Sequence, residues 1–266
     1  MMVCAFMAVD RLSALFHHFH LQAILPNSRN GLSANLLLCA TVPPDAPGLE
    51  VQFSPQGPLP SSLGWSASDI ARIHIDFGGI HNPLFAGMPA LIRMPIDAEH
   101  PAWWLANMIS NETQTPRCGG PAALDRLYEV LTIYLLRFAI EQGLCATGPM
   151  AGLADDQLKL ALVAIHDNPS APWNTEQLAE AAGLSRSALI KRFNQTVGMS
   201  PMIYVRQWRL TLAQQGLKRG ERVGKVALSF GYRSQEGFSR AFKAQFGYWP
   251  SEQASRESMG LAGREP

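Results

Sequence analysis

The second half of the sequence repeats one order of helix start and stop signals. In each copy a short helical stretch ends at a glycine, and the next stretch starts after a serine and ends before another glycine. The first copy comprises residues 176–182, Gly183, Ser185, residues 186–196 and Gly198, and the second comprises residues 223–230, Gly231, Ser234, residues 235–246 and Gly247. Serine is a preferred N-cap and glycine a preferred helix stop. A short helix, a tight turn and a capped second helix form a helix-turn-helix, whose second helix enters the DNA major groove. The sequence therefore predicts two such motifs in one chain.

A long helix predicted over residues 202–218, with Pro201 just inside its start, separates the two motifs. About 17 residues at 1.5 Å each give roughly 26 Å. With the turns added, the two second helices are expected to lie about 34 Å apart, one turn of DNA. A further helix is predicted over residues 155–165, and Thr175 is predicted to cap residues 176–182.

Each second helix is predicted to bury one face and expose the other. Leu189 and Phe193 face inward in the first helix, and an inward stripe of phenylalanines (Phe238, Phe242, Phe246) does so in the second. Glutamine suits adenine edges, and arginine and lysine suit guanine edges or phosphates. The outward residues are the candidate DNA-binding residues: Arg186, Ser187, Ile190, Lys191 and Asn194 in the first helix, and Gln235, Glu236, Gly237, Ser239, Arg240 and Lys243 in the second.

Charge is divided unevenly along the chain, although the formal net charge is only +1. Residues 171–266 carry 14 Lys and Arg against 7 Asp and Glu, whereas residues 1–170 carry 8 against 14. The basic second half predicts a polyanionic partner. With 47% hydrophobic residues, the chain is not of the disordered class.

A resemblance to a known family covers residues 155–256. The stretches GLSRSALIKRFNQTVGMSPMIYVRQWRL and VALSFGYRSQEGFSRAFKAQFGYWP are similar to the paired motifs of the AraC/XylS family of bacterial transcription regulators. The resemblance implies an all-α DNA-binding domain whose base-reading positions are Arg186, Ser187, Ile190, Lys191, Gln235, Glu236, Gly237 and Arg240. Ile190 departs from the polar residue of many members, but an apolar side chain can contact a thymine methyl. Gln253 stands where the family usually has an aromatic residue, so the last helix is expected to end loosely.

The first half predicts a smaller mixed domain. Short strands are expected over residues 36–42, 49–53 and 70–77, an apolar segment over 84–94 that ends at Pro95, and helices over 10–21, 103–112 and 121–142. Residues 144–153 are interpreted as a linker. The stretches DRLSALF and HIDFGGIHNPLFAGMPALIRMP resemble the cupin-type sensory domain of one branch of the family. Seven prolines in residues 22–66 leave too few strands for a full barrel. We therefore expect an α+β chain, with an abridged cupin-like domain over 1–148 and an all-α double helix-turn-helix domain over 149–266.

The histidines and cysteines are the residues that could bind a metal or take part in redox chemistry. His17, His18 and His20 lack an acidic or cysteine partner, and His74 and His81 do not form the His-x-His pair with a Glu that a cupin metal site uses. The sequence predicts no metal and no cofactor. Cys39 and Cys118, the latter beside Arg117, are candidate redox sensors, because some relatives respond to oxidants. The four cysteines are scattered, no secretory signal is evident and no apolar run is long enough to cross a membrane, so a reduced cytoplasmic chain is expected.

Together these patterns predict a sequence-specific, DNA-binding transcription regulator rather than an enzyme, since no nucleophile–base constellation or phosphate-binding glycine loop is present. The expected partners are double-stranded promoter DNA, RNA polymerase, a small-molecule or redox effector and a second copy in a homodimer. Two alternatives stay open: a metal-dependent cupin-type enzyme fused to a DNA-binding tail, and a regulator whose first half senses nothing. Whether the chain is an activator or a repressor depends on where its operator lies relative to a promoter.

Overall fold

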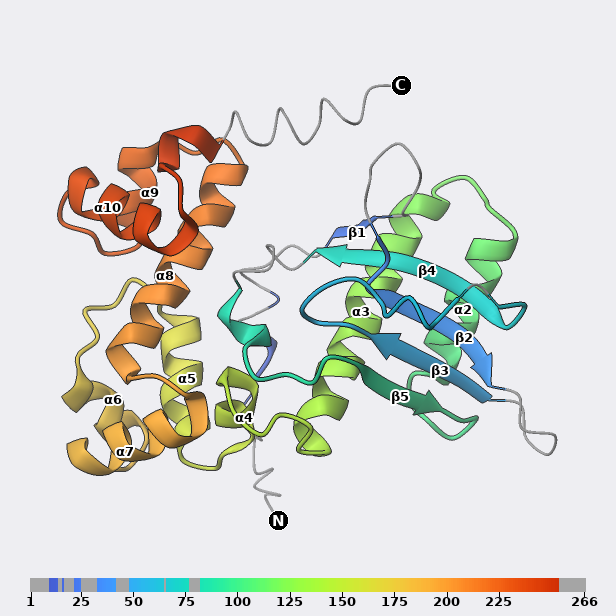
Figure 1. The fold of residues 1–266 in the computed structure, drawn as a ribbon, viewed down its shortest axis with the longest axis horizontal. Helices are drawn as coiled ribbons and strands as arrows, with labels where there is room; N and C mark the ends of the chain where they lie inside the picture. The colour runs from blue at the N-terminus through green and yellow to red at the C-terminus, as the bar shows by residue number, and fades with distance from the viewer. Residues whose placement is uncertain are drawn as a thin grey trace, which may run out of the picture.

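The computed structural model describes residues 10–13, 16, 22–24, 33–41, 48–64, 66–76 and 82–253. A sheet covered by two helices lies beside a larger group of helices, and α3 (Gly120–Glu141) and α4 (Pro149–Ala154) connect the two parts (Figure 1). The helix predicted over residues 10–21 falls mostly outside the described residues. Phe77, the last residue of the strand predicted over residues 70–77, also lies outside them.

The first part contains one antiparallel sheet of five strands in the order β1-β4-β2-β3-β5. Alternation along β4 follows the sequence pattern, since Ile73 and Ile75 are buried while Arg72 and His74 on the other face are partly exposed. The three predicted strands are confirmed. The strands are β1 (Gln22–Ile24), β2 (Leu36–Thr41), β3 (Gly48–Phe53), β4 (Asp69–Asp76) and β5 (Ile92–Ile96).

Strand β5 corrects the prediction for residues 84–94. The apolar segment was expected to end at Pro95, but Pro95 lies inside β5, opposite Glu50 of β3. Because β5 is at the edge of the sheet, proline's missing N–H leaves no ladder hydrogen bond unmade. The segment before it forms a 3-10 turn, η1 (Pro83–Phe85), which Asn82 caps by accepting a hydrogen bond from the Leu84 N–H.

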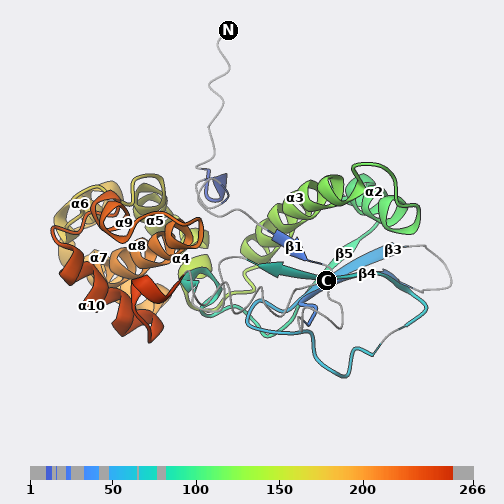
Figure 2. The same cartoon turned by 90° about the horizontal axis from the view of Figure 1, so that it is seen from above.

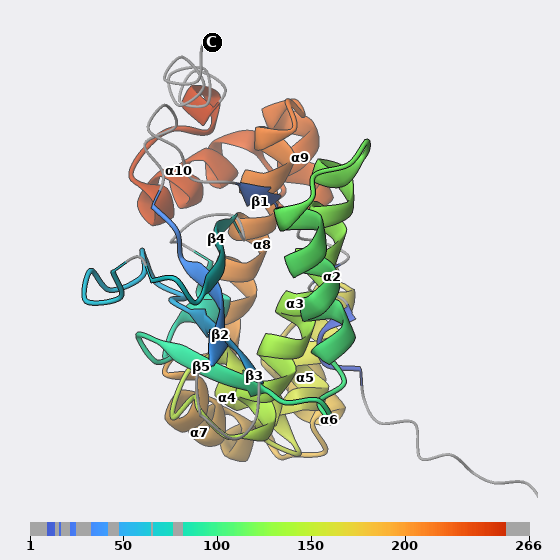
Figure 3. The same ribbon diagram turned by 90° about the vertical axis from the view of Figure 1, so that its right-hand side faces the viewer.

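Helices α2 (Trp103–Gln114) and α3 (Gly120–Glu141) lie on one face of the sheet (Figures 2 and 3). Both were predicted from sequence. Helix α3 buries Tyr128, Leu131 and Leu135 against the sheet half. This burial raises the pKa of the Tyr128 hydroxyl to about 12.

The predicted linker over residues 144–153 is only partly a linker. Its second half forms helix α4 (Pro149–Ala154), which buries Met150 and Leu153. Pro149, which follows Gly148, is favourable at the first position of a helix. Met150 and Leu153 are three positions apart and therefore share one face of that helix. Helix α4 packs against α3, α5 (Leu158–Asp167) and α7 (Arg186–Val197).

The second part is all helical, as predicted, with small differences at helix starts. Helix α5 begins at Leu158 and not at Asp155, because the Asp155 carboxylate accepts hydrogen bonds from the N–H groups of Gln157 and Leu158. Asn174, not Thr175, caps α6, in a capping box with Gln177. The helices are α5 (Leu158–Asp167), α6 (Thr175–Ala181), α7 (Arg186–Val197), α8 (Pro201–Lys218), α9 (Val223–Ser229), α10 (Gln235–Phe246) and the 3-10 turn η2 (Pro250–Glu252).

Buried apolar side chains form two clusters. The larger one runs from the sheet through α3, α4 and the first helix-turn-helix to Trp208 and Leu212 of α8. The smaller one joins Leu210 and Leu217 of α8 to α9 and the phenylalanine stripe of α10. The division into residues 1–148 and 149–266 stays a prediction, and the larger cluster crosses that boundary.

Gly148 lies in the connection between the two parts of the chain, directly before α4. Its φ is 94°, and its N–H donates to the carbonyl of Thr196 at the end of α7, at 2.9 Å. A Cβ at this position would overlap the carbonyl oxygen of Ala86.

We expect Gly148→Ala to lower the free energy of unfolding by at least about 1–3 kcal/mol, the cost of the backbone conformation alone. Gly57→Ala is the matched control, because a Cβ there meets nothing within 4 Å. Chemical denaturation of both variants tests this. Equal stabilities of the two variants would contradict the close packing at Gly148.

Candidate nucleic-acid interface

Helices α7 and α10 are built alike. Each has 12 residues. Each starts after a serine whose hydroxyl accepts a backbone N–H: Ser185 from Ala188 at 3.3 Å and Ser234 from Gly237 at 3.1 Å. Each ends at a left-handed glycine, Gly198 with φ 83° and Gly247 with φ 82°. These limits are the ones that the serine and glycine signals predict.

The turns that precede these helices are also alike. Gly183 has φ 62° and Gly231 has φ 79°, the left-handed region that favours glycine. In both, the N–H of the residue after the glycine donates to a carbonyl five residues back, Leu184 to Ala179 and Tyr232 to Ala227. The chain therefore contains two helix-turn-helix units of matching geometry.

Helix α8 sets the distance between the two units. Its 18 residues correspond to a length of about 27 Å. Helices α7 and α10 lie near opposite ends of α8 (Figure 1) and on the same side of it (Figures 2 and 3). One face of the helical part thus presents both second helices together.

The inward faces of α7 and α10 are packed as the spacing predicts. Leu189, Phe193, Phe238 and Phe242 are fully buried. Phe242 lies at the centre of an aromatic cluster, with its ring 5.6 Å from that of Phe238, 4.5 Å from Phe246 and 5.5 Å from Tyr248. These contacts fix the orientation of the opposite, solvent-facing surface of α10.

The candidate DNA-binding residues lie on the outer faces of the two helices. Those with exposed side chains are Arg186, Ser187, Lys191, Asn194, Gln235, Glu236, Arg240 and Lys243, and those that are half-buried are Ile190, Gly237 and Ser239. Lys191 and Arg240 form no ion pair or hydrogen bond with another described residue, so their charges are available to a ligand.

Three other cations on these helices have partners. Arg186 lies 3.1 Å from the Glu176 carboxylate, but both side chains are about two-thirds exposed, so the pair is weak. Lys243 lies over the Trp249 ring, 4.2 Å from its centroid. Arg192 points back to the protein, donating to Asp155 at 2.8 Å and to Gln157 at 2.9 Å.

Two contacts in this region were not predicted from sequence. Arg209 of α8 donates to the carbonyls of Pro169 and Ala171 at 2.6 and 2.5 Å, which ties α8 to the loop before α6. Gln253 was expected to leave the last helix loose, but it is buried and accepts a 2.6 Å hydrogen bond from the Tyr248 hydroxyl. A glutamine there makes a polar contact in place of the aromatic packing that the family resemblance implies.

The residues that the structure describes contain no group of three His, Cys, Asp or Glu side chains placed to hold a metal ion. His17, His18, His20 and His81 lie outside those residues. His74 is described, and its Nδ1 is 2.9 Å from the carbonyl oxygen of Ser33.

The two candidate redox cysteines differ in their surroundings. Cys39 is buried in β2, and burial together with the nearby carboxylates of Glu50 and Asp69 raises the pKa of its thiol. Cys118 is exposed, but the neighbouring Arg117 is ion-paired with Glu112. A raised pKa lowers the thiolate fraction at neutral pH, which disfavours Cys39 as a redox sensor.

We expect iodoacetamide to modify Cys118 in the folded protein near neutral pH and to leave Cys39 and the buried Cys145 unmodified. Peptide mass mapping measures this, and a urea-unfolded sample, in which all three react, is the control. If Cys39 were modified as fast as Cys118 in the folded protein, the burial of Cys39 in β2 would be contradicted.

None of the described helices combines the length and apolar content that crossing a bilayer requires.

Family models match both parts of the chain. A helix-turn-helix domain matches residues 178–256, and a cupin matches residues 36–141. The paired helix-turn-helix units therefore follow a cupin domain, an arrangement that places the chain in the class of helix-turn-helix transcriptional regulators.

Curated relatives narrow the class to a family. An uncharacterized HTH-type transcriptional regulator from Haemophilus influenzae is 36% identical over 67% of this chain and 59% of its own length. The regulatory protein SoxS from Escherichia coli is 34% identical over 35% of this chain and 87% of its own length. A putative AraC-like transcription regulator from Streptomyces lividans is 31% identical over 65% of this chain and 58% of its own length. The chain belongs to the AraC family of transcriptional regulators. It spans 57–59% of the length of the longer relatives it matches first.

Proposed function

We propose that this chain is a sequence-specific DNA-binding transcription regulator that inserts α7 and α10 into successive major grooves on one side of the double helix. The observation that carries the proposal is the matched pair of capped helices held on the same side of α8. Helix-turn-helix proteins read half-sites one helical turn apart with such helices.

The outward residues divide into two roles. Gln235 and Arg240 have donors suited to adenine and guanine edges, Glu236 accepts from cytosine, and Ile190 contacts a thymine methyl. Lys191 also has donors suited to guanine edges, and the other exposed cations neutralise phosphates, so affinity falls steeply as salt rises. When DNA binds, the Arg186 side chain leaves its weak ion pair with Glu176 and contacts the DNA instead.

The cupin-containing part modulates this binding in our proposal, as a sensory or dimerisation domain. It is joined to the first helix-turn-helix through the larger buried cluster and through α4. The protein acts in the cytoplasm, without catalysis, and contacts RNA polymerase at promoters. Among the described residues, no group of three His, Cys, Asp or Glu side chains is placed to hold the metal that a cupin-type enzyme would need, so no observation favours that alternative.

Selection of DNA from a random duplex library by the purified full chain tests the proposal. We expect enrichment of two short motifs whose centres are separated by about 10 base pairs, the helical repeat. Enrichment of a single motif would contradict the role of one of the two helices. No enrichment over a bead-only control at low salt would contradict DNA reading by this chain.

A further inference from the structure

The outer face of helix α2 exposes two large apolar side chains. The exposed fraction is 76% for Trp104 and 56% for Met108, and the two residues are one helical turn apart. On the neighbouring helix α3, Val130 is also exposed, and Ala123 and Leu127 line a groove of about 320 Å³ together with Met108. We call the surface of these five residues the hairpin face. A contiguous apolar surface of this kind, unlike a single exposed apolar residue, marks an interaction site.

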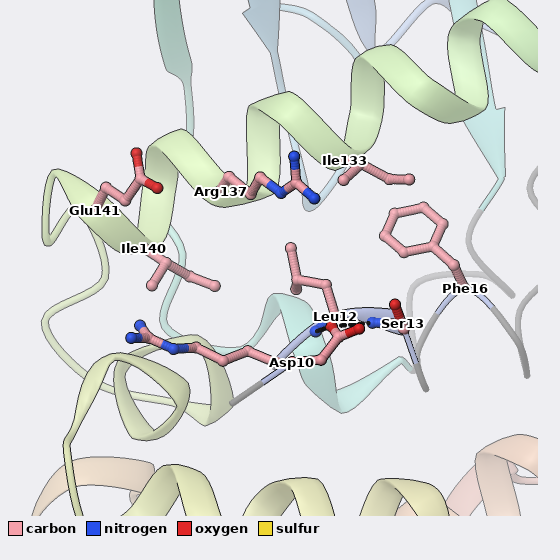
Figure 4. A pocket seen from close by; sticks show the side chains of 9 residues that line it. Asp10, Leu12, Ser13, Phe16, Ile133, Arg137, Ile140 and Glu141 are labelled. Carbon is pink, nitrogen blue, oxygen red and sulfur yellow. Dashed lines mark hydrogen bonds between the residues drawn. The ribbon is translucent and has the colours of Figure 1, made fainter. Parts of the chain in front are cut away.

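The hairpin face points away from the sheet. Ala106 and Ile109, on the opposite side of α2, are fully buried in the larger cluster. The described part of the N-terminal segment lies farther along α3, where Leu12 and Phe16 point toward Ile133 and other residues of that helix (Figure 4). The hairpin face is therefore open to an occupant from outside the chain.

The DNA-reading helices are not on this side of the molecule. Helices α7 and α10 lie on one side, and α2 and α3 lie on the opposite side (Figures 2 and 3). An occupant of the hairpin face therefore leaves α7 and α10 accessible.

The charges at the two ends of α2 indicate what kind of occupant fits. Asp97 and Glu99 are exposed directly before the helix, and Glu99 forms no ion pair with another described residue. Arg117 follows the helix, and its side chain stays 68% exposed although it pairs with Glu112. Its guanidinium has five N–H donors and can therefore bind a second carboxylate. A second α2 that runs antiparallel to the first places each acidic start beside the other's arginine, whereas a parallel one places like charges together.

We infer that the hairpin face binds a second copy of this chain in a two-fold symmetric dimer whose α2 helices run antiparallel. A two-fold axis between Trp104 and Met108 places the Trp104 ring of each copy on Met108 of the other, beside the groove. Sulfur–aromatic contacts of this kind are favourable, and tryptophan and methionine are enriched at protein interfaces. The inference rests on the dimerisation role in the proposed function.

Sedimentation velocity of the full chain without DNA tests the dimer. We expect a dimer that dissociates on dilution, with a Kd in the micromolar range or below, and a monomer at every concentration up to about 100 µM would overturn the inference.

Three variants assign the dimer to the hairpin face. Trp104→Ala is expected to weaken association roughly thirtyfold or more, because buried tryptophans contribute most to interfaces. Glu99→Lys, which brings like charges together, is expected to weaken it roughly tenfold. Leu228→Ala is the matched control, since Leu228 is 70% exposed on α9, and its association is expected to be unchanged. Unchanged association in Trp104→Ala would overturn the assignment.

Cross-linking tests the antiparallel order. Ala98 and Cys118 are both exposed, one before α2 and the other after it. Within one copy the 12 residues of α2 keep these positions about 18 Å apart. A short bismaleimide is expected to join the new thiol of Ala98→Cys to Cys118 of the other copy and to give a covalent dimer.

The covalent dimer is expected to disappear when Cys118→Ser is added to Ala98→Cys. A covalent dimer that persists without Cys118, or no covalent dimer with it, would overturn the antiparallel arrangement. Because none of these readouts contains DNA, their failure would leave the proposal of DNA reading to its own test.

Discussion

Replacing both Lys191 and Arg240 with alanine is expected to weaken binding to the selected DNA by about 2–6 kcal/mol, and each single replacement by about 1–3 kcal/mol. The two residues belong to different helix-turn-helix units, and both project from exposed faces without a partner among the described residues. Their losses should therefore add. Fluorescence anisotropy of labelled duplex at one salt concentration measures the DNA affinity of the two single variants and of the double variant.

The pattern of loss separates the two roles of these side chains. Replacing a residue that reads bases lowers the affinity of the protein for the selected sequence and not for scrambled DNA. Replacing a residue that contacts a phosphate lowers both affinities equally. Arg126→Ala is the control, because Arg126 is exposed on α3, far along the chain from both units. Unaltered affinity in the double variant, in folded protein, would contradict the assigned interface.

Replacing Phe242 with alanine is expected to destabilise the second helix-turn-helix by about 3–5 kcal/mol, the usual cost of removing a fully buried phenylalanine side chain. The ring is the centre of the smaller buried cluster, whose buried members differ from those of the larger one and which shares with it only the partly buried Phe230 among the described residues. We therefore expect residues 223–246 to open while α7 and the sheet stay folded, a local unfolding that hydrogen exchange resolves.

Phe193→Ala is the matched variant in the larger cluster. Phe193 is also fully buried, and its ring lies 5.9 Å from Tyr204. Its loss should raise exchange in α7 and in helices joined to the same cluster, and leave α10 protected. If each variant raised exchange equally in α7 and α10, the two clusters would form one cooperative unit, contrary to our interpretation.

The helical part was predictable because its boundaries depend on local chemistry. Ser185, Gly198, Ser234 and Gly247 each satisfy backbone groups within a few residues of themselves, so their effect can be read from the sequence alone. The inward stripes follow from helical periodicity for the same reason. The order of helices and the outward residues came from these local signals.

Features that depend on contacts between distant segments were missed. Helix α4 is short, and it is stabilised by burial of Met150 and Leu153 against other helices rather than by its own propensity. Pro95 is acceptable in β5 only because β5 is at an edge, which no local pattern reveals.

Binding of the full chain to its selected duplex, compared with scrambled duplex of the same length at two salt concentrations, tests the central claim most directly. We predict that both affinities fall as salt rises, and that the selected duplex stays bound more tightly by roughly a thousandfold or more. Equal affinity for the two duplexes at both salt concentrations would contradict sequence reading by α7 and α10.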